Sequence, residues 1–127
     1  MNLLLDTHVA LWAFSGPNRL GSKTRAAIID PRNTVAVSAA TVLEIEIKRA
    51  LGKLEAPVGF AALCLDRGFE PLDITFAHAE TAGSLPRHHD DPFDRILIGQ
   101  ALIEGFELVT VDRAFDDYDV ETFNALR

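Results

Sequence analysis

Short apolar runs alternate along this chain with longer segments that end at glycine or proline. Leu3–Leu5 is continuously apolar, which is typical of a strand buried on both faces of a sheet. Further strands are predicted at Thr34–Ser38 and Glu107–Val111. A weaker strand at Phe69–Asp73 contains Pro71, so it is expected to be short or to lie at an edge.

Helices are predicted between these strands, and local residues mark several of their ends. Asp6 is placed as an N-cap, Pro31 ends one helix, and Gly52 follows another as a left-handed cap. The predicted helices are Thr7–Phe14, Ser22–Asp30, Thr41–Leu51, Pro57–Gly68, Thr75–Leu85, Pro92–Glu104 and a short one at Arg113–Asp117, with a further edge strand at Val120–Phe123. Strands that alternate with helices pair in parallel and carry helices on both faces. The predicted fold class is therefore α/β, a three-layer α/β/α sandwich around a short, mainly parallel sheet.

The composition fits a single domain that spans residues 1–127. Hydrophobic residues make up 48% of the chain, which is enough for a core. The only cysteine, Cys64, excludes an internal disulfide and fits a reducing cytosol. The N-terminus has no positive region, and no apolar run approaches the ~18 residues of a membrane span. We therefore expect a cytoplasmic protein that does not associate with membranes.

The formal net charge is −7, from 19 acidic and 12 basic residues. This balance argues against a cationic nucleic-acid binder, whose affinity comes from neutralising phosphates. It is compatible with an enzyme that holds phosphates through a bound metal, and it would attract a basic protein partner.

Four acidic residues recur close to the ends of predicted strands. Asp6 and Asp112 directly follow strands, Glu44 lies a few residues beyond another, and Asp94 lies in the first turn of a helix. The carboxyl ends of parallel strands share one edge of the sheet, so these acids can converge. Each like-charge pair ~5 Å apart costs about 3 kcal/mol at an effective dielectric near 20, and Mg²⁺ or Mn²⁺ is the usual cation that offsets it.

Each acid also has an ordinary structural explanation. The two acids that follow strands can be helix N-caps. Glu44 would complete a capping box with Thr41 and can pair with Lys48 four residues later. Asp91 can cap the helix whose first turn contains Asp94. Capping does not explain why the acids recur at one edge, so we favour a metal-binding carboxylate cluster.

Four segments resemble motifs of the PIN-domain ribonucleases, in the same order and spacing. Leu3–Trp12 resembles the opening of that family, and Ser38–Ile45 resembles its second motif. Leu85–Ala101, with its His-His-Asp-Asp-Pro-Phe-Asp-Arg core, is very similar to a hallmark of the VapC toxin branch. Leu108–Tyr118 resembles the closing motif. The resemblance covers nearly the whole chain, and the third segment is its most specific part.

The resemblance implies a Mg²⁺-dependent endoribonuclease toxin, with Mn²⁺ as an alternative ion, that hydrolyses RNA with a metal-activated water. It implies a homodimer that is neutralised by a cognate VapB-like antitoxin. Asp6 and Asp94 would be direct metal ligands, and Glu44 and Asp112 would act directly, through water or on a second ion. The implied catalytic and metal-binding quartet is Asp6, Glu44, Asp94 and Asp112.

Polar neighbours of the acids are candidate substrate-binding residues, namely Thr7, Ser38, Arg95 and Thr110. The hydroxyls can hydrogen-bond the carboxylates or the phosphate, whereas Arg95 can contact phosphate or pair with Asp91. His88 and His89 can bind a transition metal or move protons. We favour a simpler interpretation, in which this histidine pair caps the next helix or packs at the rim of the site.

The first predicted helix carries apolar residues on all sides, among them Val9, Leu11, Trp12 and Phe14. The apolar surface of this helix is larger than one core-facing side can bury, so the helix either contacts a protein partner or is buried on two sides. Two other functions stay open: a Mg²⁺-dependent phosphohydrolase or nuclease that acts on DNA or a small phosphate ester, and a PIN-like module that binds RNA without cutting it.

Overall fold

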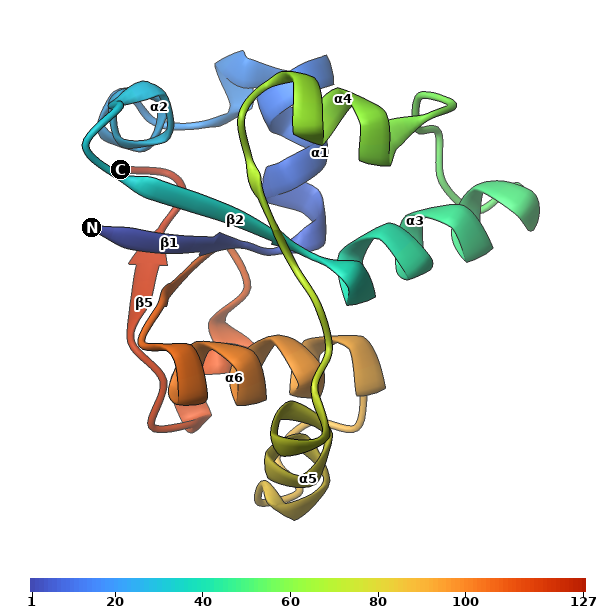
Figure 1. The fold of residues 1–127 in the computed structure, drawn as a ribbon, viewed down its shortest axis with the longest axis vertical. Helices are drawn as coiled ribbons and strands as arrows, with labels where there is room; N and C mark the ends of the chain where they lie inside the picture. The colour runs from blue at the N-terminus through green and yellow to red at the C-terminus, as the bar shows by residue number, and fades with distance from the viewer.

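Five parallel strands form the central sheet of the computed structural model, which describes residues 1–127 (Figure 1). The strands lie in the order β3-β2-β1-β4-β5. Their bounds are β1 (Asn2–Leu5), β2 (Thr34–Ser38), β3 (Glu70–Leu72), β4 (Glu107–Thr110) and β5 (Thr122–Asn124). The two strands predicted to be weak, β3 and β5, are the edges. In the centre, Leu4 pairs with Ala36 on one side and Leu108 on the other.

Helices cover both faces of this sheet, as predicted. Their bounds are α1 (Thr7–Ser15), α2 (Ser22–Ile29), α3 (Ala39–Ala50), α4 (Phe60–Asp66), α5 (Phe76–Ser84) and α6 (Pro92–Glu104), with 3-10 helices η1 (Pro17–Arg19) and η2 (Arg113–Asp117). In Figure 1, α1, α2 and α4 lie above the sheet, α6 lies below it with α5 packed against α6, and α3 extends from the right-hand edge. No helix is both long and apolar enough to span a membrane.

The hydrophobic core consists of two clusters, one on each face of the sheet. Alternate residues of one strand point to opposite faces, so Leu3 and Leu5 join the cluster under α1, α2 and α4. Leu4 joins the cluster under α6 with Leu97 and Phe115. All three leucines are at most 1% exposed, which confirms that β1 is buried on both faces.

Two predicted helix starts were wrong. We expected α3 to begin with a Thr41 capping box, but it begins at Ala39, because Ser38 ends β2 in an extended conformation and accepts the Ala40 amide hydrogen at 3.0 Å. The helix predicted from Pro57 begins at Phe60. Gly59 precedes it with a left-handed φ of 77°, which delays the first helical turn.

Candidate active site

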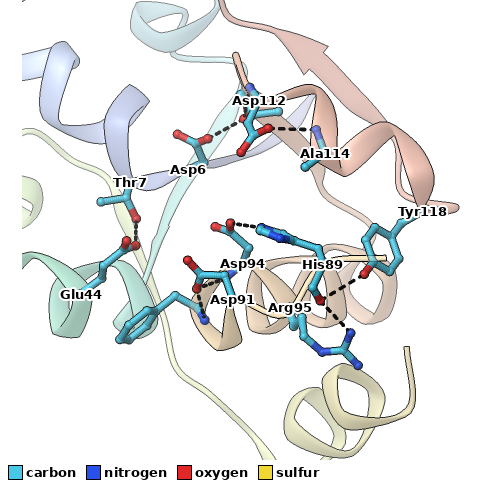
Figure 2. Close-up of polar contacts among 12 residues, drawn as sticks. Asp6, Thr7, Glu44, His89, Asp91, Asp94, Arg95, Asp112, Ala114 and Tyr118 are labelled. Carbon is cyan, nitrogen blue, oxygen red and sulfur yellow. Dashed lines mark hydrogen bonds and ion pairs between the residues drawn. The ribbon is translucent and has the colours of Figure 1, made fainter. Parts of the chain in front are cut away.

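The carboxyl ends of β1, β2 and β4 and the first turns of α1, α3 and α6 meet at one edge of the sheet. Figure 2 shows the side chains of Asp6, Glu44, Asp94 and Asp112 around a common space at this edge. Charge interactions link Asp6 with Asp112 and Asp94 with Glu44, and Asp94 and Asp112 can share one ion. The structure therefore brings together all four acids that the sequence singled out.

Asp6 is held by both of its carboxylate oxygens. As the N-cap of α1 it accepts a hydrogen bond from the Val9 amide at 3.1 Å. Its other oxygen accepts the Thr110 hydroxyl hydrogen at 2.5 Å, and Thr110 in turn accepts from the Asp112 amide at 3.0 Å. Burial raises the pKa of Asp6, although the bonds from Thr110 and Val9 oppose that shift. The capping interpretation of Asp6 is thus correct, and it coexists with a place in the acidic cluster.

Glu44 is almost completely buried, with 4% exposure, and both of its oxygens have partners. Oε1 accepts the Thr7 hydroxyl hydrogen at 2.5 Å. Oε2 accepts a hydrogen from the Lys48 ammonium at 2.5 Å, which confirms the predicted i,i+4 pair. Glu44 is therefore fixed between α1 and its own helix.

Asp94 and His89 form the most polarised contact of the site, with 2.6 Å between Asp94 Oδ2 and His89 Nε2. Burial raises the pKa of Asp94 to about 6, the bond with His89 opposes the shift, and the charges of Asp91 and Glu44 add to it. The same hydrogen bond raises the pKa of His89. Asp94 is therefore a carboxylate whose ionised form the metal-free fold disfavours.

His89 has a larger part in the site than our preferred sequence interpretation gave it. Ligand atoms of His89, Asp94 and Asp112 all lie within 4.8 Å of one another. His88 does fit that interpretation, because its ring packs edge-on against Tyr118 with the centroids 5.3 Å apart. The sequence signal that could have found His89 was its place five residues before Asp94, just ahead of a capped helix start.

The donor chemistry of this cluster fits a divalent cation. Asp94 Oδ1 and Asp112 Oδ2 accept no hydrogen bond from the protein, whereas the second oxygen of each has a partner. Carboxylate oxygens suit Mg²⁺ and Mn²⁺, and the Nε2 atom of His89 is already bonded to Asp94. The arrangement can hold one ion between α6 and the end of β4.

The four candidate substrate-binding residues divide into two groups. Thr7 and Thr110 donate to carboxylates of the cluster, as described above. Ser38 is fully buried and caps α3, so its hydroxyl is directed to the Ala40 amide. Arg95 faces away from the acids. Only the first pair contacts the acids.

Arg95 instead binds the loop that precedes α6. Its guanidinium donates to the carbonyls of Leu85 at 2.8 Å, Pro86 at 3.0 Å, His89 at 3.1 Å and Gly83 at 3.5 Å. It does not pair with Asp91, which caps α6 by accepting the Phe93 and Asp94 amide hydrogens. With its donors used in this way, Arg95 is a structural residue of the loop, and we do not retain it as a phosphate contact.

A broad hollow lies beside α1, separate from the acids. Its volume is about 680 Å³, and it is lined by apolar and polar side chains that include Leu11, Trp12, Arg19 and Leu54. Leu11 is buried, whereas Trp12 is half-buried and packs only partly against the core. Most of this helix is therefore buried on two sides, as one of the two alternatives expected, and Trp12 also borders open space.

Comparison with known proteins identifies the fold and close relatives. The PIN-domain family model matches residues 3–121. The chain is 33% identical over 114 residues to ribonuclease VapC22 of Mycobacterium tuberculosis, covering 87% of each protein. A second relative, ribonuclease VapC16 of the same organism, is 41% identical over 61 residues, or 45% of this chain and 43% of that one.

Solved structures have the same fold at low sequence identity. A chain of the VapBC2 complex from Rickettsia felis bound to a DNA fragment from its promoter superposes with a TM-score of 0.70 and 17% identity, over 98% of each chain. A toxin–antitoxin complex from Klebsiella pneumoniae gives a TM-score of 0.66 and 22% identity, over 92% of each chain. At these identities the likeness describes the fold alone.

Proposed function

Because the chain belongs to the PIN-domain family, we propose that it is a metal-dependent endoribonuclease and the toxin of a toxin–antitoxin pair. The observation that carries this proposal is the convergence of Asp6, Glu44, Asp94 and Asp112 on one edge of the sheet. Its relatives VapC22 and VapC16, both ribonucleases, give it independent support.

Asp94 and Asp112 would hold the ion, because each has an oxygen without a protein partner. We propose Mg²⁺, with Mn²⁺ as the alternative, because carboxylate oxygens suit both ions. When bound, such an ion lowers the pKa of water and offsets charge on a phosphodiester. Asp6, oriented by Thr110, would bind the ion directly or accept a proton from the attacking water. His89 keeps Asp94 in place through Nε2.

The substrate proposed here is single-stranded or looped RNA. Purified protein would be incubated with single-stranded RNA and with DNA of the same sequence, in Mg²⁺, Mn²⁺ or EDTA. We expect cleavage of RNA only with metal, and loss of cleavage in Asp6→Asn and Asp94→Asn while the circular dichroism spectrum stays unchanged. Asp119→Asn is the matched control, since Asp119 is exposed and lies outside the cluster.

The alternatives predict different results in the same assay. Cleavage of DNA rather than RNA would identify a different nuclease, and RNA binding without cleavage in any metal would identify a binding module. Full activity of either site variant would refute the assignment of the acids.

We further propose that a basic antitoxin segment binds this acidic chain. The hollow beside α1 supports it, because the half-buried side chains of Trp12 and Leu54 offer apolar surface for such a segment. The net charge of −7 favours a partner of opposite sign. The VapBC2 complex and the toxin–antitoxin complex that share this fold are compatible with a VapB-like partner.

A homodimer in the cytoplasm completes the proposal. Leu43 and Ile47 on α3 and its C-cap residue Leu51 recur every four residues, and all are exposed. Such an apolar stripe supports burial against a second copy of the chain. The single cysteine, Cys64, is buried and unpaired, which suits a reducing compartment.

A further inference from the structure

Lys48 lies at the edge of the acidic cluster, and the mechanism above gives it no part. Its side chain is 39% exposed, and its ammonium donates to Glu44 Oε2 at 2.5 Å. Lys48 therefore pairs with one acid of the cluster and keeps access to solvent.

Two other cations near Lys48 are engaged elsewhere. The guanidinium of Arg95 binds four backbone carbonyls, one in the last turn of α5 and three in the loop before α6. Arg49, the neighbour of Lys48, pairs with Glu46 and with the Pro57 carbonyl. An ammonium has three donors, and Lys48 uses only the one that contacts Glu44. The remaining donors of the Lys48 ammonium are therefore free, and α3 holds this side chain at the edge of the site.

Glu44 holds Lys48 in this position. Its carboxylate is buried and anchored to α1 by the Thr7 hydroxyl, so it does not move as a surface acid would. An unpaired carboxylate at this depth would be costly, and the Lys48 ammonium offsets that cost. Glu44 Oε1 is bound by the Thr7 hydroxyl and Oε2 by the Lys48 ammonium, whose positive charge opposes a metal ion at the same oxygen. Asp6 differs, because its partners are a neutral amide and a neutral hydroxyl.

We propose that Lys48 contacts a backbone phosphate of the RNA, and that Glu44 is a positioning residue for Lys48 rather than a direct metal ligand. The inference rests on the proposed ribonuclease function and names its cationic substrate contact. A lysine ammonium is a compact point charge that suits a phosphate oxygen without fixing a base identity. The contact therefore adds affinity for the RNA backbone and no sequence preference.

The test measures binding of a fluorescently labelled single-stranded RNA by anisotropy, with Ca²⁺ replacing Mg²⁺ to prevent cleavage. In Lys48→Met we expect about tenfold weaker binding, the usual size of a lost hydrogen bond to a charged group. The slope of log Kd against log salt should fall by about 0.7, the value for one phosphate contact on a single strand. Lys48→Arg should restore most of both quantities.

Lys53→Met is the matched control, since Lys53 is exposed just beyond α3 and forms no ion pair. Mn²⁺ binding, measured by electron paramagnetic resonance without RNA, should be equal or tighter in Lys48→Met and unchanged in Glu44→Gln. The second variant should nevertheless bind RNA more weakly, because Lys48 loses its anchor.

The outcomes separate this inference from the proposed function. If the wild type neither binds nor cuts RNA, the function itself fails and the inference with it. If the wild type cuts RNA but Lys48→Met keeps the wild-type salt slope, Lys48 only neutralises Glu44 and the inference is overturned. Loss of Mn²⁺ binding in Glu44→Gln would overturn the positioning role and make Glu44 a ligand.

Discussion

Without metal, the Asp94→Asn variant should be more stable than the wild type at pH 7 and lose this advantage at pH 4. Burial holds the folded-state pKa of Asp94 at about 6, against 3.8 for an ordinary aspartate. The folded protein therefore binds more protons than the unfolded chain between these values, and the free energy of unfolding falls as the pH rises through this window. The partnership of His89 with Asp94 acts in the same direction, because the raised pKa of His89 gives stability at low pH that is lost as the pH rises.

The magnitude follows from the shift. A displacement of roughly two pKa units, at about 1.4 kcal/mol per unit, corresponds to about 3 kcal/mol by pH 7. The variant loses the favourable interaction of a negative charge with the first turn of α6, about 0.3–1 kcal/mol. The expected net gain is therefore about 2 kcal/mol for the variant at pH 7.

Urea unfolding in EDTA at pH 4, 5, 6 and 7 measures this difference, with Asp119→Asn as the control for loss of one exposed charge. Added Mg²⁺ should stabilise the wild type by about 2.7 kcal/mol at 100 times its dissociation constant and the variant by less. A variant that is less stable at every pH, with the same response to Mg²⁺, would refute the reasoning and make Asp94 only a helix-terminus residue.

Two further predictions concern the surroundings of the site. Arg95→Ala should destabilise the protein by about 2–3 kcal/mol, because four carbonyls lose their donor. Arg87→Ala, which removes an exposed ion pair with Asp90, is the control and should have little effect. Equal thermal melts of the two variants would contradict the structural role of Arg95. The fluorescence of Trp12 should change when the cognate antitoxin binds, and hydrogen exchange should slow in Thr7–Ser15; equal protection with and without the partner would place its binding surface elsewhere.

The sequence predicted the sheet edge well because its signals are local. Asp6 and Asp112 directly follow strands, and parallel pairing alone brings such residues to one edge. The i,i+4 relation of Glu44 and Lys48 was also visible, since helix geometry fixes it. These features need no knowledge of the strand order.

The features that sequence reasoning missed depend on contacts between distant segments. The Thr7 hydroxyl donates to Glu44, which lies 37 positions away in sequence. The sequence offered Glu44 as a capping-box residue, whereas this bond fixes its carboxylate in the site. The guanidinium of Arg95 binds backbone carbonyls as far away in sequence as Gly83. Every residue has a main-chain carbonyl, so no pattern of side chains identifies the ones that accept these bonds. The role of His89 also depends on this loop, because the conformation of the loop places the imidazole within hydrogen-bonding distance of Asp94.

The way in which Arg95 holds its loop has a consequence for how this protein can change. Every hydrogen bond from Arg95 goes to a main-chain oxygen, which each residue type supplies, so these bonds do not depend on which side chains the loop carries. Residues such as Arg87 and His88 can therefore be substituted while the backbone conformation of the loop and the orientation of His89 stay the same. The rim of the site can therefore carry different side chains while the acidic cluster keeps its geometry.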